Sequence, residues 1–203
     1  YSDVATPLVD CGAVTYLDSG QPIGAAATLD VALGDLDGDG DQDIVFGNVA
    51  GELNQVWTND GTGIYSDSGQ TLTSRFTAVA IGDVDGDLDL DVITATSSPL
   101  GNVVYINDGA GNFSPGPTLG TAGVQDVEVG DVDGDLDLDV VLIKPGLLPN
   151  EVWLNDGAGG YLNSGQALGL NNSFGGALAD VDNDNDLDLF VANVGPNRIY
   201  LND

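Results

Sequence analysis

Short apolar runs rich in β-branched residues recur along the chain, each directly after a segment in which aspartate alternates with other residues. No stretch places apolar residues at the 3.6-residue period of a helix. Together with the 30 glycines, this pattern argues against helices and predicts an all-β protein. Around the first run we expect strands at about 28–34, 43–49, 53–58 and 64–72, with an Asn-Asp-Gly turn between the last two.

The aspartate-rich segments recur at a fixed spacing. Their first aspartates stand at positions 35, 83, 131 and 180, so the period is 48, 48 and 49 residues. A fixed period of this size indicates a repeat architecture. Each copy carries five aspartates at alternate positions of a nine-residue segment, and the copies span 35–43, 83–91, 131–139 and 180–188.

Carboxylates packed this densely repel one another unless a cation lies among them. We expect Ca²⁺, which takes about six to eight oxygen ligands and tolerates the irregular geometry of a loop, whereas Mg²⁺ requires a stricter octahedron. An EF-hand is excluded, because it needs an acidic residue at loop position 12. That position is occupied here by Phe46, Thr94, Leu142 and Val191.

The segments therefore predict four strand–loop–strand sites, with four Ca²⁺ per chain. The candidate metal ligands are Asp35, Asp37, Asp39, Asp41, Asp43, Asp83, Asp85, Asp87, Asp89, Asp91, Asp131, Asp133, Asp135, Asp137, Asp139, Asp180, Asp182, Asp184, Asp186 and Asp188.

The first of these segments, followed downstream by Val56-Trp57-Thr58-Asn59-Asp60-Gly61, resembles an FG-GAP/VCBS repeat, the β-propeller blade of integrin α-subunits. The resemblance covers residues 16–203. It implies a β-propeller of four four-stranded blades, with a calcium loop between the first two strands of each. It also implies that loop positions 1, 3, 5 and 9 bind through side chains and position 7 through its carbonyl. Because position 6 is glycine only in the first copy, we expect the tight turn at position 4.

The two ends of the chain are out of phase with the repeat. Residues 1–15 match no repeat and form an N-terminal arm, whereas 16–21 match 65–70 and 161–166, the last strand of a blade. The chain stops after the third strand of the fourth repeat. Joining the ends within one molecule gives a four-bladed ring, and self-association by strand exchange through residues 1–23 gives a head-to-tail filament.

Composition narrows the classes of function. The net charge is −30, with three basic residues, so nucleic acid is excluded as a partner. An adaptation to high salt would also explain an acidic surface. No run approaches ~18 apolar residues, so no membrane insertion is expected. The chain has no histidine and one cysteine, which removes Ser-His, Cys-His and zinc chemistry. A carboxylate that holds calcium cannot also act as a general acid, and we expect no enzyme.

We expect a calcium-stabilised structural or adhesive module, secreted or on the cell surface, because such loops fill where Ca²⁺ is abundant. Its partner would be a second copy of the chain or an extracellular protein or glycan. The alternative is a lectin-like, carbohydrate-binding propeller, which would need aromatic side chains facing solvent. The aromatic residues at equivalent repeat positions are instead expected between blades. They are Trp57, Tyr105, Trp153 and Tyr200.

Three single features complete the expectations. Cys11 has no partner for an internal disulfide and is either a buried small side chain or a bridge between molecules. Asn112 and Asn171 fit the acceptor pattern for N-glycosylation. A start at Tyr1, without methionine or signal peptide, is expected of a mature or trimmed product.

Overall fold

All regular structure in the described part of the chain is β-strand, which confirms the predicted class. The computed structural model describes residues 15–24, 26–49, 52–72, 78–96, 101–121 and 123–203. Apart from Thr15, the expected N-terminal arm with Cys11 lies outside these residues. Within them, no helix is long and apolar enough to cross a membrane.

The strands form four antiparallel sheets, and each strand pairs with its neighbour in the sequence. The sheets consist of β1 (Thr28–Gly34), β2 (Asp43–Asn48), β3 (Asn54–Asn59) and β4 (Tyr65–Leu72); β5 (Ala78–Gly82), β6 (Asp91–Ala95), β7 (Asn102–Asn107) and β8 (Phe113–Leu119); β9 (Asp126–Gly130), β10 (Asp139–Ile143), β11 (Asn150–Asn155) and β12 (Tyr161–Leu168); and β13 (Ser173–Ala179), β14 (Asp188–Asn193) and β15 (Arg198–Tyr200). The predicted strands of the first repeat agree with β1–β4 to within one residue.

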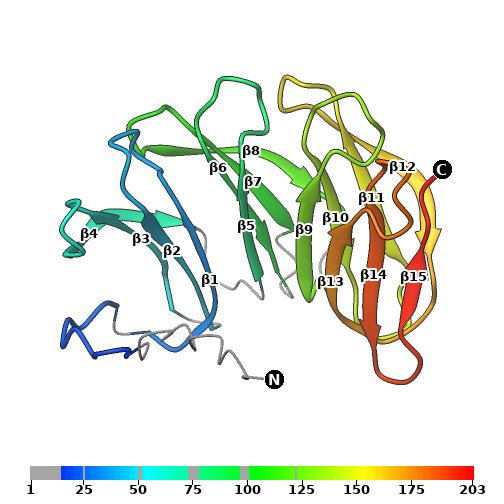
Figure 1. The fold of residues 1–203 in the computed structure, drawn as a ribbon, viewed down its shortest axis with the longest axis horizontal. Helices are drawn as coiled ribbons and strands as arrows, with labels where there is room; N and C mark the ends of the chain where they lie inside the picture. Colours follow the sequence, from blue (N-terminus) through cyan, green and yellow to red (C-terminus); the bar gives the residue numbers. More distant parts are fainter. Residues whose placement is uncertain (1–14, 25, 50–51, 73–77, 97–100, 122) are drawn as a thin grey trace, which may run out of the picture.

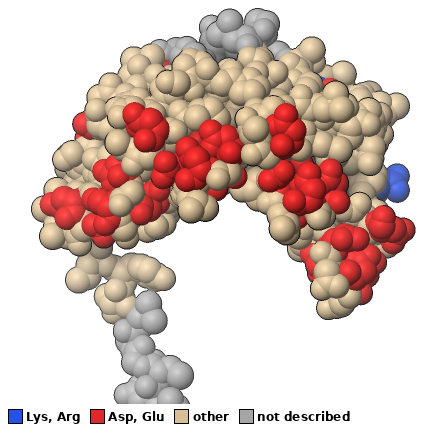
Figure 2. Space-filling model, turned by 90° about the horizontal axis from the view of Figure 1, so that it is seen from above, with Lys and Arg blue, Asp and Glu red and all other residues tan. Residues whose placement is uncertain are grey.

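The sheets are the four blades of a β-propeller, as predicted. Their first strands contact one another in turn, β1 with β5, β5 with β9 and β9 with β13. The first and last sheets stand at opposite ends of the series (Figure 1), and a hollow separates them (Figure 2). Three blades have four strands and the last has three, because β15 pairs with β14 alone among the described strands. Among the described residues the four blades thus form an open arc, and no strand joins the last sheet to the first.

Apolar side chains fill the space between adjacent sheets, and we call each such contact a joint. The joint between the first two sheets buries Leu36, Val45 and Val56 against Val79 and Val92. Corresponding residues fill the joints between the second and third sheets and between the third and fourth. Fully burying one such side chain stabilises a fold by about 1.5–3 kcal/mol, so the three joints hold the sheets in order.

The aromatic residues of the third strands follow the same plan. Tyr105 is buried in the first joint, while Trp153 and Tyr200 pack against the second and third clusters. These positions confirm the predicted packing between blades. Trp57 is the equivalent residue of the first sheet, before which the described chain supplies no sheet.

A glycine at the end of the first strand lets the next sheet approach closely. A Cβ added at Gly82 would lie 2.6 Å from Leu138 Cδ1, and one added at Gly34 would lie 2.6 Å from Ile81 Cδ1. Gly130 has the same role against Leu187, at 2.8 Å. A larger residue here would have to displace the side chain of the next sheet that packs against the glycine.

We therefore expect Gly82→Ala to lower the free energy of unfolding by about 1–3 kcal/mol through overpacking. In a domain of this size each kcal/mol shifts the melting temperature by about 2–4 °C. Gly175→Ala in β13 is the matched control, because the nearest atom to its added Cβ is 3.5 Å away. Thermal unfolding of both variants checks this, and equal melting temperatures would contradict the close approach.

Glu128 on β9 gives the fold a pH dependence. Burial, followed by the charges of Asp126 and Asp30, raises the pKa of Glu128 to about 7 from its ordinary value of 4.5. Because the pKa of Glu128 is higher in the native than in the unfolded protein, its contribution to the free energy of unfolding is fully present below about pH 4.5. It is lost as the pH rises towards 7.

Glu128→Gln should therefore raise the free energy of unfolding at pH 8 by about 1–2 kcal/mol. This is less than the full pKa difference would give, because solvent screens the charge of a half-exposed side chain. The gain over the wild type should shrink as the pH falls to 5. Chemical denaturation at several pH values measures it, with Glu52→Gln, at an exposed position, as the control for loss of one charge. A gain that does not vary with pH would show that the charge of Glu128 is not its source.

Candidate metal centre

The four aspartate segments are loops on one face of the molecule. Each loop connects the first and second strands of its sheet, as predicted. Seen from above, acidic side chains gather in a band that follows the arc (Figure 2). We number the loop positions 1 to 9 from the first aspartate of each segment.

The carboxylate at position 1 shapes each loop. In the second loop, Asp83 Oδ1 accepts the N–H of Gly86 at 2.9 Å, and Oδ2 accepts the N–H of Leu88 at 3.0 Å. The other loops repeat both bonds. Each carboxylate oxygen keeps a second lone pair, so position 1 can still offer an oxygen to a cation.

Two residues in each loop, rather than the expected one, have a left-handed backbone. In the second loop φ is +79° at Gly86 and +77° at Leu88. The prediction of a turn at position 4 was therefore incomplete, because position 6 is left-handed as well. Leu136 of the third loop has a φ of +78°. A left-handed residue with a Cβ costs roughly 1–2 kcal/mol, which the bond to the position 1 carboxylate partly offsets.

The carboxylate at position 9 ties the loop to the sheet. Asp91 is fully buried; its Oδ2 accepts the N–H of Val84 at 2.9 Å and its Oδ1 accepts that of Asn107 at 2.8 Å. The same two bonds occur in every loop. Burial raises the pKa of Asp91 to about 6, although these N–H groups act to lower it. Position 9 was predicted only as a ligand, and the structure adds this anchoring role.

The carboxylates at positions 1, 3 and 9 converge. In the second loop, one oxygen from each of Asp83, Asp85 and Asp91 lies within 4.8 Å of the others. Asp85 Oδ1 is buried and has no hydrogen-bond partner among the described residues. Burial, followed by the charge of Asp87, raises the pKa of Asp85. The site thus holds an oxygen that is shielded from water and lacks a donor.

The side chain at position 5 accepts a backbone bond within the loop, and the side chain at position 7 lies against a turn of the same sheet. Asp87 Oδ1 accepts the N–H of Asp89 at 3.0 Å, and the other loops repeat this bond. The carboxylate of Asp89 lies against Gly109 of the Asn-Asp-Gly turn, where it leaves no room for a Cβ. In the second loop, the position 7 side chain is thus directed to this turn and not to the group formed by Asp83, Asp85 and Asp91.

An asparagine at or just after the end of the third strand links neighbouring loops in the second, third and fourth sheets, a role that was not predicted. Asn107 Nδ2 donates to Leu90 O in its own sheet at 3.0 Å and to Leu36 O in the preceding loop at 2.8 Å. Asn155 and Asn202 make the same pair of bonds. The signal was present in the sequence, since an asparagine follows each aspartate loop, 16 residues after its last aspartate in the first three repeats and 14 in the fourth.

The structure thus brings together some of the predicted ligand side chains of each loop but not all of them. Positions 1, 3 and 9 meet in the second, third and fourth loops, and positions 1, 3 and 5 meet in the first. In the fourth loop, Asp182 and Asp184 also meet Asp203, which was not predicted. Position 7 side chains are absent from these groups of described carboxylates.

Because Leu88 is 88% exposed, it loses no packing when its side chain is removed. We expect Leu88→Gly to raise the free energy of unfolding by about 1 kcal/mol, since glycine adopts the left-handed backbone without a Cβ penalty. Leu162→Gly, in the extended strand β12, should instead lower it by up to about 1 kcal/mol. Thermal unfolding of both variants checks the signs, and destabilisation by Leu88→Gly would contradict the strain.

Comparison with solved structures supports the fold. A lectin of Agrocybe aegerita, described as recognising non-reducing terminal N-acetylglucosamine, is 20% identical with a TM-score of 0.51. The match covers 84% of this chain and 51% of the lectin, so the chain spans about half of that protein. The Tc holotoxin pore of Photorhabdus luminescens is also 20% identical, with a TM-score of 0.49 over 84% of this chain and 9% of the toxin. No curated protein matches the chain.

The repeat itself matches a known family. The model of the FG-GAP-like repeat matches twice, over residues 35–94 and 83–142. Each match begins at the first aspartate of a loop and ends within the second strand of the next sheet. The two matches together cover more than half of the sequence, so the chain belongs to the FG-GAP-like repeat family.

Proposed function

We propose that this chain is a calcium-stabilised structural or adhesive module that acts outside the cell, with one Ca²⁺ in each aspartate loop. The observation that carries the proposal is the buried Oδ1 of Asp85, which has no hydrogen-bond partner among the described residues, in a loop where the carboxylates of Asp83, Asp85 and Asp91 converge. A buried polar atom without a partner is costly, and a cation would satisfy it.

The donors of the loops fit a hard cation. They are carboxylates and peptide carbonyls, the oxygen ligands that Ca²⁺ takes, and no loop contains the nitrogen or sulfur ligands that zinc favours. Desolvation, followed by neighbouring aspartates, raises the pKa of Asp133 and of Asp182, and burial does the same for Asp37. Bound calcium would supply positive charge at these carboxylates and reverse their repulsion.

Within each loop, positions 1, 3, 5 and 9 would hold the ion through side chains and position 7 through its carbonyl. Because positions 1 and 9 also bind backbone N–H groups, the ion would hold together the residues that already link the first three strands of a sheet. The fourth loop could add Asp203.

The placement outside the cell follows from affinity and charge. Extracellular calcium modules bind at about 10⁻⁴–10⁻³ M, a concentration of free Ca²⁺ that the cytosol does not provide. Four ions would offset eight of the 30 net negative charges. A non-catalytic role is supported by the lack of histidine and by the use of the clustered carboxylates in shaping the loops.

A sugar-binding role receives less support. The likeness to the Agrocybe aegerita lectin concerns the fold, and sugar binding would need aromatic rings that face solvent. Tyr105 is buried, and Trp153 and Tyr200 are packed against the joints. A structural or adhesive role does not require aromatic rings that face solvent.

Calorimetric titration of the chelated protein with Ca²⁺ tests the proposal. We expect four sites, and Asp85→Asn should remove one of them, because the neutral amide weakens the converging set. Asp67→Asn in β4 is the control, since this exposed residue lies outside every loop, and it should keep four sites. One or two sites in the wild type, or a full count in Asp85→Asn, would contradict the proposal.

A further inference from the structure

We propose that the aspartate loops bind Ca²⁺ cooperatively, because an asparagine near the end of the third strand joins the metal site of its own sheet to that of the preceding sheet. The coupling rests on the proposed binding of Ca²⁺, and it adds that each site regulates its neighbours. It gives Asn107, Asn155 and Asn202 the role of positioning residues between sites.

The backbone of loop position 2 is held from two sides. In the first loop, the N–H of Leu36 donates to Oδ2 of Asp43, its own position 9 carboxylate, at 2.9 Å. The carbonyl oxygen of Leu36 accepts a bond from Nδ2 of Asn107, in the following sheet, at 2.8 Å. Val84 of the second loop makes the same two bonds, at 2.9 and 2.7 Å. Position 2 thus stands between the metal site of its own loop and the sheet that follows.

The asparagine carries the connection on to the next metal site. The backbone N–H of Asn107 donates to Asp91 Oδ1 at 2.8 Å, while its side chain reaches back to Leu36 O. Asp91 Oδ2 in turn accepts the N–H of Val84, where the pattern starts again. The third and fourth loops continue it. One line of hydrogen bonds therefore joins the position 9 carboxylates of all four loops.

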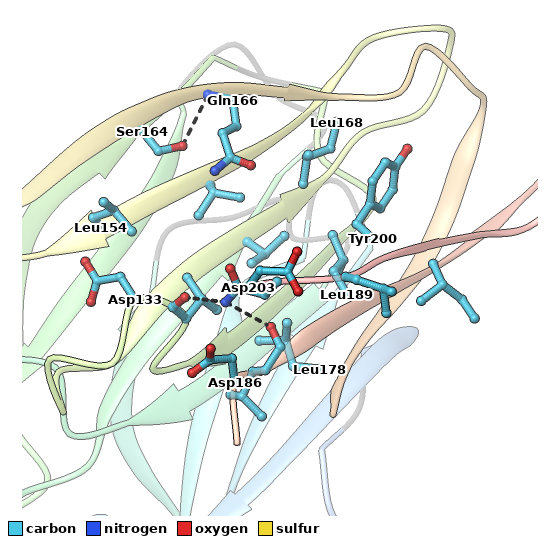
Figure 3. A pocket seen from close by; sticks show the side chains of 17 residues that line it. Asp133, Leu154, Ser164, Gln166, Leu168, Leu178, Asp186, Leu189, Tyr200 and Asp203 are labelled. Carbon is cyan, nitrogen blue, oxygen red and sulfur yellow. Dashed lines mark hydrogen bonds between the residues drawn. The ribbon is translucent and has the colours of Figure 1, made fainter. Parts of the chain in front are cut away.

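Figure 3 shows the link between the third and fourth loops, near Asp133 and Asp186. Dashed lines mark the bonds of Asn202 Nδ2 to Val132 O, at 2.6 Å, and to Leu187 O. One carboxamide thus holds position 2 of one loop and position 8 of the next.

Much of this line is shielded from water. Asp43, Asp91 and Asp139 are fully buried, and Asn107 is 3% exposed. A buried group that loses its hydrogen-bond partner is left unsatisfied at a cost, because water does not replace the partner. A loop that opens therefore leaves buried groups of the neighbouring sheet without partners.

A packing contact runs beside the hydrogen bonds. The hairpin between β7 and β8 lies against the first loop, where a Cβ added at Gly111 would be 3.3 Å from Asp37 Cβ. Gly109 of the same hairpin lies against the carboxylate of Asp89 in the second loop. The hairpin between β11 and β12 lies in the same way against position 3 of the second loop. Each of these hairpins thus supports a candidate ligand of the preceding loop.

The position 2 backbone is the element through which one site acts on the next. Without a cation, the carboxylates of a loop repel one another and favour its opening. Opening separates position 2 from position 9 and releases the carbonyl that holds the next asparagine. A cation in one loop would keep these groups in place, so the neighbouring loop would need less ordering to bind its own ion. Because such coupling is reciprocal, each ion should raise the affinity of both neighbouring loops.

Coupling along this line differs from coupling through unfolding of the whole chain. In a repeat protein each repeat contacts its nearest neighbours, so the effect of one lost site should fall off with distance along the chain. Unfolding of the whole chain would affect all loops alike.

Hydrogen exchange of the full chain, followed by mass spectrometry, gives for each loop the Ca²⁺ concentration at which its amides are half protected. With Asp85→Asn, which removes the second site, this midpoint should rise about fivefold or more in the first and third loops, as is typical of coupled sites. In the fourth loop it should change by less than about twofold. Equal rises in all three loops, or no rise in any, would overturn the proposal.

Asn107→Ala tests the asparagine itself, with Asn102→Ala as the matched control. Asn102 is also buried, but its side chain makes its bonds at the other end of β7, away from the loops. In the Asn107→Ala background, Asp85→Asn should raise the midpoint of the third loop and no longer that of the first. In the Asn102→Ala background it should raise both. A first loop that still responds without Asn107 would overturn the role of the asparagine.

A second cut guards against a variant that does not fold. In the Asn155→Ala background, Asp85→Asn should raise the midpoint of the first loop and not that of the third. The pattern of protection also separates coupling from binding. If no loop gains protection with Ca²⁺, both the binding and the coupling are wrong. If all four loops of the wild type gain protection but none responds to Asp85→Asn, the sites bind Ca²⁺ and only the coupling is wrong.

Discussion

Each blade depends on holding several carboxylates of like charge close together in one loop. Positions 1 and 9 accept backbone N–H groups and join the loop to the third strand. At position 3, Asp37 accepts the N–H of Asp39 in the first loop, whereas Asp85 Oδ1 in the second is buried and has no donor among the described residues. A cation bound there would satisfy this oxygen and offset the repulsion among the neighbouring carboxylates.

The loops also connect the blades. Asn107 binds carbonyls of two successive loops, and the residue at position 2, such as Leu36, is buried by the sheet that follows. Disturbing one loop should therefore be felt in the next sheet. In the last described sheet, Ile199 is half exposed, whereas its counterpart Val56 is buried by the sheet that follows.

The repeated sequence pattern was sufficient to predict much of the fold and of the candidate site. The alternation of aspartate and the period of the repeat predicted the strands, the loops between them and the residues that converge, including Asp83, Asp85 and Asp91. The left-handed backbone of Leu88 was not predictable, because leucine avoids that conformation and only the bonds to Asp83 reveal why it is held there. The spacing of the repeat also does not determine how one sheet is oriented against the next, so it left open whether the four blades would close.

Thermal unfolding of the wild type in excess EGTA, and after return of Ca²⁺ or Mg²⁺, tests most directly whether a cation holds the loops together. Binding to the native state alone adds about 2.7 kcal/mol per site at a hundredfold excess over Kd. Chelation should then lower the melting temperature by more than about 10 °C. Ca²⁺ should restore it and Mg²⁺ should do so poorly. A melting curve unchanged by EGTA, or restored equally by both ions, would contradict the account.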